Sequence, residues 1–307
     1  MRWYKEIFCF GRHFGFRAIW NITICPRIFR SRSRSEGILS FLEKVFKDEL
    51  LRLRDNNSIN NNVLSSNEKI WLCWWQGKDE MPQTIRNCID SIYYYHKDCT
   101  ITILDRFNYS NYVEVPEVII DKVTKKVMTL SQFSDILRCA VLYKHGGIWL
   151  DSALFCTSHG NWNGMKFFSP KINIDNNSYI SGFKWVPGCI GAVQGFLMFG
   201  FAYECFIKYW QKYSFLVDFL MVDYIFELAY RNNVLIRDII DNRSFNNEGI
   251  HKSRYLFNDR CDENVFQQLI NDNSFLSLTW RFQYHTHTDN GELTYYGRLL
   301  QEFENQK

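Results

Sequence analysis

Three charged side chains in the middle of the chain could together bind a polar ligand. Asp135 and Arg138 are three residues apart, and Asp151 follows shortly after them. On a helix, positions three apart lie side by side, so the carboxylate and the guanidinium would emerge together. Asp151 is followed by Ser152 and Ala153, so the second carboxylate that a metal-binding enzyme would use is missing. The alternative interpretation is a structural ion pair on a helix surface and an unrelated aspartate.

Local sequence patterns place these side chains at one rim of a sheet. Residues 131–144 have apolar side chains at spacings of three and four, which predicts a helix that carries the Asp–Arg pair on another flank. Gly146 and Gly147 end this helix, because glycine adopts a left-handed cap conformation at low cost. The apolar run after them predicts a strand that ends at Asp151. This order of elements favours a binding site over a chance ion pair.

The preceding segments predict an α/β fold with a parallel sheet. Residues 69–75 read as a buried strand, residues 81–96 as a helix with Pro82 in its first turn, and residues 99–105 as a second strand. Strand, helix and strand at this spacing imply parallel strands covered by helices. Asp105 would then lie at the carboxyl end of a strand, where open α/β sheets bind their ligands.

An asparagine-rich stretch gives the clearest boundary in the chain. We expect a basic, aromatic helical extension over residues 1–55, a linker over residues 56–67, the main α/β domain over residues 68–300 and a tail over residues 301–307. Within the extension, the apolar positions of residues 36–55 predict one helix.

Charge is distributed unevenly along the chain. Residues 1–35 carry eight basic side chains and one acidic one, whereas the rest of the chain carries 28 basic and 32 acidic side chains. The basic residues alternate with aromatic rings, a pattern that suits an anionic membrane surface. The alternative is a helical subdomain whose rings pack on the main body. Nucleic acid is not expected as a partner, because the body is acidic.

The sequence predicts neither a membrane span nor a disulfide framework. No run of 18 or more apolar residues occurs, which is the length a spanning helix needs. The ten cysteines are scattered, with no C-x-x-C pair and no zinc-like spacing. We therefore expect free thiols in a reducing cytoplasm.

Around the charged cluster, the sequence resembles the capsular polysaccharide synthesis protein family, which is allied to glycosyltransferase family 32. The signature S-D-x-x-R stands at residues 134–138, and the run Leu-Tyr-Lys-x-Gly-Gly with its following apolar residues and aspartate stands at residues 142–151. The resemblance covers about residues 68–300. Supporting similarities occur at residues 69–77, 181–192, 216–230 and 278–282.

This resemblance implies a GT-A fold, a Rossmann-like mixed sheet that binds a nucleotide diphospho-sugar, with a UDP-sugar expected. The implied activity is transfer of a sugar, with retention of configuration, to a saccharide acceptor in capsular or surface polysaccharide synthesis. We expect a lipid-linked acceptor and a peripheral location at the inner face of the cell membrane. The departing diphosphate would be stabilised electrostatically, which requires no protein nucleophile.

The resemblance also implies roles for particular residues. Trp75 would stack on the nucleotide base, because a flat ring offers a large contact area at little entropic cost; the alternative is a core indole, as expected for Trp71 and Trp74. Asp223 would contact a sugar, or else occupy an exposed position on an amphipathic helix. The implied nucleotide-sugar residues are Trp75, Gln76, Asp105, Asp135, Arg138, Gly147 and Asp151, and the implied catalytic residues are Asp135, Arg138, Asp151 and Asp223.

Ala153 departs from the D-x-D motif of such enzymes, whose second carboxylate binds Mn²⁺ or Mg²⁺. A methyl group cannot ligate, so three arrangements remain open. Asp151 could hold a metal together with the diphosphate, with His285 as a second ligand. Alternatively, Arg138 or Lys144 could supply the positive charge, although Lys144 also fits as an ordinary cation at a helix end.

Two other functions remain open on the sequence. Ala153 would suit a non-catalytic protein of the same fold that binds a saccharide or a nucleotide sugar. The intact set of Asp135, Arg138 and Asp151 argues against this interpretation, because binding alone would not need all three. A protein-glycosylating effector would use the same chemistry on a different acceptor.

Overall fold

The computed structural model describes residues 13–14, 34–56, 58–173 and 179–307. The expected membrane-surface segment, residues 1–35, therefore lies almost entirely outside the described residues. Within the described part of the chain, no helix is both long and apolar enough to cross a bilayer.

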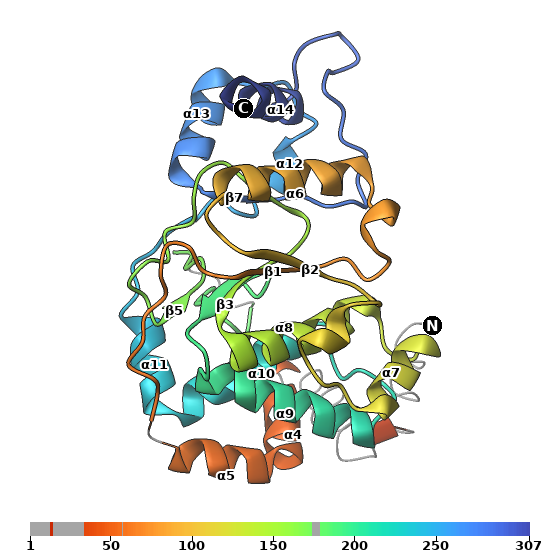
Figure 1. Cartoon of the computed structure of the whole chain (residues 1–307), viewed down its shortest axis with the longest axis vertical. Helices are drawn as coiled ribbons and strands as arrows, with labels where there is room; N and C mark the ends of the chain where they lie inside the picture. The colour runs from red at the N-terminus through yellow and green to blue at the C-terminus, as the bar shows by residue number, and fades with distance from the viewer. Residues whose placement is uncertain (1–12, 15–33, 57, 174–178) are drawn as a thin grey trace.

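A mixed five-stranded sheet forms the centre of the molecule, with strand order β2-β1-β3-β6-β5 (Figure 1). β1 (Ile70–Cys73) lies parallel to both β2 (Ile101–Leu104) and β3 (Gly147–Leu150). β6 (Cys189–Ala192) runs antiparallel to β3, and β5 (Phe167–Phe168) runs antiparallel to β6. The predicted parallel strands are confirmed, and all three carboxyl ends meet at one edge of the sheet.

A smaller layer covers one face of this sheet. β4 (Leu154–Cys156) and β7 (Phe275–Ser277) form an antiparallel pair, against which α6 (Gln83–Tyr95) packs. α13 (Glu263–Asp272) and α14 (Tyr295–Gln306) complete this layer (Figure 1). Aromatic and aliphatic side chains from these elements form a buried cluster separate from the main core.

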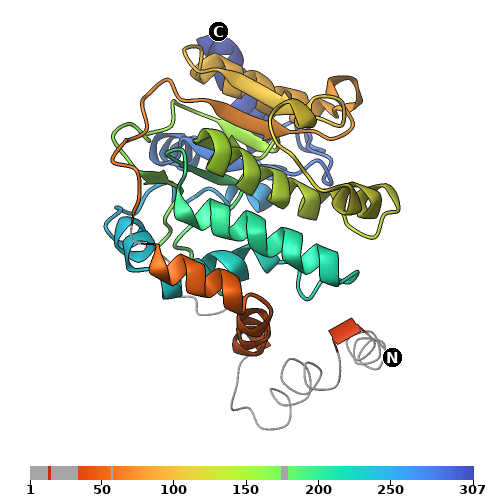
Figure 2. The same ribbon diagram turned by 60° about the horizontal axis from the view of Figure 1, so that its bottom comes forward.

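Helices are stacked against the other face in successive layers (Figure 2). α8 (Leu130–His145) packs on β1 and β3, and α9 (Leu197–Lys212) packs on α8. α10 (Met221–Asn232) packs on α9, and α4 (Arg34–Val45) and α5 (Lys47–Asp55) lie outermost against α10. Residues 34–55 of the expected extension are thus packed onto the body of the protein.

The single helix predicted over residues 36–55 forms as two helices, because the chain leaves helical geometry at Phe46. The backbone angles of Phe46 are φ −103° and ψ 23°. Its ring is fully buried, and the apolar residues of both helices belong to the main hydrophobic core. Turning the chain at Phe46 lets both helices bury an apolar face, which one straight helix could not do on this curved surface.

Short elements connect these layers. One of them, α12 (Ser253–Leu256), follows the loop after α11 (Val234–Asp241). The remaining elements are the 3₁₀ helices Lys78–Glu80 and Tyr109–Asn111, α7 (Glu117–Thr124), α11 (Val234–Asp241) and α12 (Ser253–Leu256).

The sequence pattern that predicted α8 is confirmed almost to the residue. Thr129 and Gln132 form a reciprocal capping box at its start, which satisfies two otherwise unpaired backbone N–H groups. Gly146 follows its end with φ 67°, a conformation that favours glycine. Because both ends are defined, the side chains in the middle of α8 have fixed directions.

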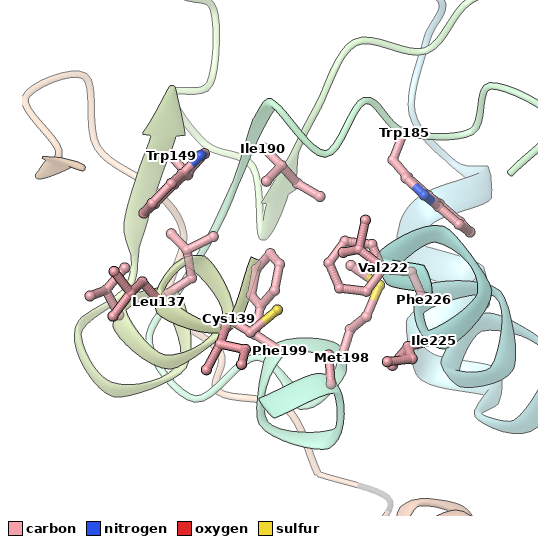
Figure 3. Close-up of a cluster of buried hydrophobic side chains, with 14 of the residues drawn as sticks. Leu137, Cys139, Trp149, Trp185, Ile190, Met198, Phe199, Val222, Ile225 and Phe226 are labelled. Carbon is pink, nitrogen blue, oxygen red and sulfur yellow. The ribbon is translucent and has the colours of Figure 1, made fainter. Parts of the chain in front are cut away.

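The main core joins the sheet to the helix layers behind it. Its largest fully buried side chains are tryptophans and phenylalanines, which pack with Leu, Ile and Met from neighbouring elements. Such close packing leaves a buried indole little freedom to move. Figure 3 shows part of this core, with Leu137, Cys139, Trp149, Trp185, Ile190, Met198, Phe199, Val222, Ile225 and Phe226 labelled.

Candidate functional site

Arg138 binds both predicted carboxylates. Its Nη1 lies 2.7 Å from Asp135 Oδ1, and its Nη2 lies 3.0 Å from Asp151 Oδ1. The Arg138 side chain is 4% exposed, whereas that of Asp151 is 49% exposed. The three side chains therefore meet, as their spacing predicts, with the guanidinium beneath and Asp151 at the surface.

Two further residues hold the Asp151 carboxylate in place. The indole N–H of Trp149 donates to Asp151 Oδ1 over 2.8 Å, while its ring lies 5.2 Å from the Arg138 guanidinium carbon. The Asp151 backbone N–H donates to the Gly188 carbonyl over 2.7 Å. A Cβ at Gly188 would come within 2.5 Å of Asp151 Oδ2. Oδ1 thus receives two protein donors, while no described residue donates a hydrogen bond to Oδ2.

Asp223 belongs to the same group. It lies in the first turn of α10 and is 7% exposed, so the alternative of an exposed position on that helix is excluded. Trp185 donates its indole N–H to Asp223 Oδ1 over 2.9 Å. Burial raises the pKa of Asp223 to about 6, against the opposing effects of Trp185 and Arg138. Asp218, in contrast, precedes the helix and accepts the N–H of Leu220.

The cluster carries more negative than positive charge. Burial raises the pKa of Asp135, the nearby carboxylates of Asp151 and Asp223 raise it further, and Arg138 opposes them. Two carboxylates thus share one buried guanidinium, and the third, Asp223, is influenced by its charge without a direct contact. Such a site is rich in hydrogen-bond acceptors, which suits a neutral ligand that bears several hydroxyl groups.

A cavity of about 250 Å³ opens beside Asp151 and Asp223. Trp185, Ala153 and Arg254 contribute to its walls. The volume is suited to a small polar ligand such as one sugar ring. Asp135 and Arg138 do not line this cavity, so their direct contribution is to hold Asp151. A larger surface cavity of about 560 Å³, between residues 245–249 and α13, contains none of these carboxylates.

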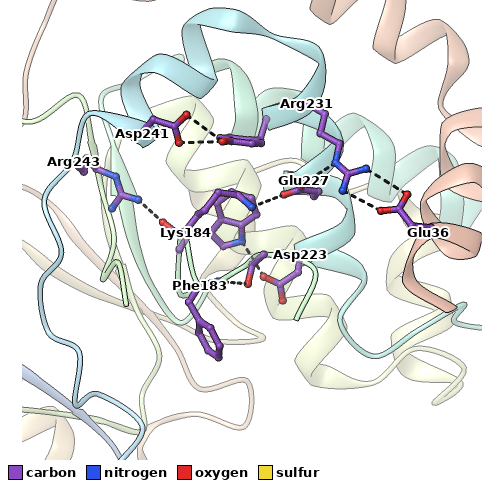
Figure 4. Close-up of polar contacts among 11 residues, drawn as sticks. Glu36, Phe183, Lys184, Asp223, Glu227, Arg231, Asp241 and Arg243 are labelled. Atoms are coloured by element: carbon purple, nitrogen blue, oxygen red, sulfur yellow. Dashed lines mark hydrogen bonds and ion pairs between the residues drawn. The ribbon is translucent and has the colours of Figure 1, made fainter. Parts of the chain in front are cut away.

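The loop that carries Trp185 and Gly188 is tied down by an ion-pair network (Figure 4). Lys184 Nζ lies 3.0 Å from Glu227 Oε2, and Arg231 Nε lies 2.7 Å from Glu227 Oε1. Arg231 continues the network to Glu36 of α4. The buried Glu227 is thereby compensated, and α4 is connected to the floor of the site.

Trp75 and Asp105 follow β1 and β2, at the same sheet edge as Asp151. Trp75 is half-buried, with its ring edge-on to Phe133 at 4.9 Å and tilted against Tyr109 at 5.3 Å. Asp105 Oδ1 accepts the N–H of Phe107 over 2.8 Å and that of Asn108. Asp105 therefore shapes its own turn with one oxygen. Gln76, beside Trp75, is exposed.

Gly147 and Lys144 lie at the other end of β3. Gly147 has φ 99°, and a Cβ there would collide with the carbonyl of Lys69. This glycine is therefore explained by strand packing and does not lie at the edge that carries Asp151. Lys144 is exposed, and its carbonyl accepts a hydrogen bond from Gln194 beside this amino end. Arg138 already pairs with two carboxylates, and Lys144 lies at the opposite end of β3 from Asp151, so neither cation proposed from the sequence is placed to compensate a diphosphate at that edge.

The residues at Asp151 do not fit a protein-built divalent metal site. Ala153 offers a methyl group to the cavity, and its carbonyl already accepts the Leu278 N–H over 2.8 Å. Among the described residues, no group of three His, Cys, Asp or Glu side chains could hold a metal ion. His285 is exposed on the loop after β7, where its backbone N–H donates to Asn258 Oδ1. Of the carboxylates that line the cavity, Asp151 and Asp223 each keep one oxygen, Oδ2, to which no described residue donates a hydrogen bond.

Several residues of the site were not singled out from the sequence. Trp149 appeared only as a strand residue, and Trp185 and Gly188 only as part of a similar segment. The turn dipeptide Pro187-Gly188 was the available signal, because it marks a tight reversal beside a short strand. Arg254 had no local signal, since it reaches the site through the pairing of distant strands.

Fold and site together define an α/β protein with an acidic pocket at the carboxyl ends of its parallel strands. Residues 21–299 match the family described as capsular polysaccharide synthesis protein. The chain belongs to this family, which confirms the resemblance.

A curated relative is similar over part of the chain. An O-glycosyltransferase, braB, from Annulohypoxylon truncatum is 28% identical over 180 residues, which cover 53% of this chain and 42% of the relative. The match thus spans less than half of that protein. No solved structure matches the chain.

Proposed function

We propose that this protein is a glycosyltransferase that moves a sugar from a nucleotide diphospho-sugar to a saccharide acceptor in capsular or surface polysaccharide synthesis. The observation that carries the proposal is the placement of Asp151. Arg138 and Trp149 fix one of its carboxylate oxygens, no described residue donates a hydrogen bond to the other, and Asp151 lines a sugar-sized cavity at the strand ends. Family membership and the O-glycosyltransferase relative support the same reaction class.

The proposed donor would lie along the carboxyl edge of the sheet, as in a GT-A fold. Trp75 would provide a face for the nucleotide base, and the second oxygen of Asp105 would accept a ribose hydroxyl. Asp151 and Asp223 would accept hydrogen bonds from the hydroxyls of the transferred sugar. Their fixed geometry means that little reorganisation is needed when the substrate binds.

The reaction would break the bond between the anomeric carbon and the diphosphate while an acceptor hydroxyl attacks. For retention, the attack would come from the face that the diphosphate leaves. The main requirement on the protein is stabilisation of negative charge on the departing oxygen. A UDP-sugar is the expected donor, and a lipid-linked saccharide at the inner membrane face is the expected acceptor.

A donor screen tests the proposal. Purified protein would be incubated with UDP-, GDP- and CMP-sugars, with and without Mn²⁺, and followed by thermal shift and by release of the nucleotide. We expect one donor to raise the melting temperature and to be hydrolysed slowly. Asp151→Asn, which preserves shape, should abolish hydrolysis and weaken donor stabilisation. Asp289→Asn, at an exposed loop position, controls for the lost charge.

The outcomes separate the transferase from the nucleotide-sugar-binding protein, one of the functions that the sequence left open. Stabilisation by a donor without turnover, even with lipid-linked saccharide acceptors present, would favour a nucleotide-sugar-binding protein, for which Ala153 is the supporting observation. No response to any donor would contradict both functions.

A further inference from the structure

We propose that Arg254 binds the diphosphate of the donor and supplies the positive charge that a D-x-D metal would otherwise provide. This inference rests on the proposed function, and it assigns to Arg254 a role that no sequence motif indicates. It accounts for Ala153 as a feature of the site rather than as a lost ligand.

The cavity beside Asp151 has two electrostatically different walls. One wall presents the carboxylates of Asp151 and Asp223. Another part of the lining, from the segment around α12 and from β7, presents Arg254, His251 and Ser277. A sugar diphosphate has the same polarity, with hydroxyl groups at one end and anionic oxygens at the other. The acidic wall would repel the phosphates, so they must point toward the basic wall.

Arg254 has charge and hydrogen-bonding capacity to spare. Its Nη2 donates to Ser277 Oγ over 3.1 Å, which leaves its charge uncompensated. Its Nε is buried without a hydrogen-bond partner, and no described carboxylate forms an ion pair with it. A half-buried guanidinium in this condition is costly to maintain without a ligand. Its planar fork matches two phosphate oxygens at once.

Arg254 lines the same cavity as Ala153, the position at which the second metal-binding carboxylate is missing. Ser277, which it contacts, pairs with Leu154 across the small sheet, and the next residue, Leu278, donates its N–H to the Ala153 carbonyl. Ala153 and Arg254 line the same cavity. An aspartate at position 153 would add a third carboxylate to the cavity that holds this guanidinium and would offset its charge. The methyl group leaves the cation free for an anionic ligand.

The other nearby cations are already engaged. Arg138 contacts two carboxylates, and Lys184 is paired with Glu227. Burial and the charge of Arg254 lower the pKa of His251, so this imidazole is neutral near pH 7 and can add only a neutral hydrogen bond. Among the described residues that line the cavity, Arg254 is the fixed positive charge available to a phosphate.

Calorimetric titration of the full chain in EDTA tests this assignment. The probes are UDP with uridine, GDP with guanosine, and inorganic pyrophosphate. The proteins are the wild type, Arg254→Gln, Arg254→Lys and Arg260→Gln. Arg260 is a matched control, because it is exposed and pairs with Glu292 outside the cavity. Nucleoside affinity reports whether each variant retains its fold.

We expect the wild type to bind one nucleoside diphosphate more tightly than its nucleoside without any metal. Arg254→Gln should weaken diphosphate binding on the order of 10- to 100-fold, the loss of one charge-assisted contact, with nucleoside affinity unchanged. Arg254→Lys should recover part of this affinity, and Arg260→Gln should behave as the wild type.

Four results would overturn one proposal or both. If Arg254→Gln binds the diphosphate as tightly as the wild type, or if wild-type binding is lost in EDTA and restored by Mn²⁺, the role of Arg254 is wrong and the donor reading stands. If only pyrophosphate binds, through Arg254, the anion site stands and the nucleotide donor is wrong. If no probe binds, both are wrong.

Discussion

The two ends of β3 carry parts of the same sequence signature but are built in opposite ways. At the amino end, a Cβ on Gly146 would lie 2.7 Å from the Gln194 nitrogen, and Gly147 is pressed against Lys69. At the carboxyl end, Asp151 keeps an oxygen to which none of the described residues donates, and Arg254 lines the same cavity. Closed packing at one end fixes the strand, so that the open end can hold unsatisfied groups for a ligand.

The largest expected loss of stability comes from a substitution at the amino end of β3. Gly147→Ala places a methyl group against the Lys69 carbonyl in a backbone conformation with φ 99°, so both a clash and backbone strain result. We expect the free energy of unfolding to fall by about 3–5 kcal/mol. Urea denaturation followed by circular dichroism measures this loss.

Gly77→Ala separates the two contributions. Gly77 has φ 98°, but a Cβ there would meet no atom within 4 Å. It should therefore show the backbone strain alone, about 1–2 kcal/mol. Equal losses in the two variants would show that Gly147 is not held by close packing, and the contrast between the ends of β3 would lose its basis.

A smaller effect of opposite sign is expected at the carboxyl end. Asp223→Asn removes a buried negative charge while retaining an oxygen that accepts the Trp185 N–H. Because the pKa of Asp223 is raised to about 6 in the fold, the folded state binds this proton more tightly than the unfolded state does. The carboxylate therefore costs stability above pH 6, and the cost disappears as the pH falls toward 4.

Denaturation measured between pH 4.5 and pH 8 tests the sign. Asp223→Asn should be more stable than the wild type by on the order of 2 kcal/mol at pH 8, with the difference shrinking toward pH 4.5. Asp289→Asn, at an exposed position, should show no such trend. If the stability difference between Asp223→Asn and the wild type did not change with pH, burial would not be destabilising the ionised Asp223 carboxylate. The expected gain illustrates the stability that a binding site gives up.

Local sequence patterns predicted the position of the Asp135, Arg138 and Asp151 cluster, but they did not predict that Arg254 lines the same cavity. The spacing of apolar residues in α8, the glycine pair and the following apolar run predict where Asp135, Arg138 and Asp151 meet. These signals are local, because helix periodicity and capping depend on neighbours in the chain.

Residues that arrive through long-range pairing had no comparable signal. Gly188 meets Asp151 because β6 lies antiparallel to β3, and Trp185, three residues earlier, reaches Asp223. Arg254 arrives because β7 pairs with β4. Asp223 was ambiguous for a related reason: α10 is buried nearly all round, so its sequence does not reveal whether one aspartate faces solvent or the core.

Gly188→Ala gives the smallest expected change in stability, and it sharpens the contrast with Gly147. Its added Cβ would meet Asp151 Oδ2 at 2.5 Å, but that atom belongs to a side chain that can rotate, not to the backbone. The loss in unfolding free energy should therefore stay below about 1 kcal/mol, as for most changes that avoid core disruption. A small rotation of the carboxylate, however, would tilt its hydrogen bonds to Arg138 and Trp149 without removing them, and would redirect Oδ2.

Donor hydrolysis by Gly188→Ala should accordingly fall on the order of 10-fold or more, because small misplacements of a positioning group are costly in rate. Gly164→Ala is the control for a loop glycine, since a Cβ there meets no atom within 4 Å. Full activity in Gly188→Ala would show that the direction of Asp151 is not critical. A loss of stability as large as that in Gly147→Ala would place Gly188 with the packing glycines instead. The expected pattern assigns Gly147, in β3, to stability of the fold and Gly188, directly before β6, to the geometry of the site.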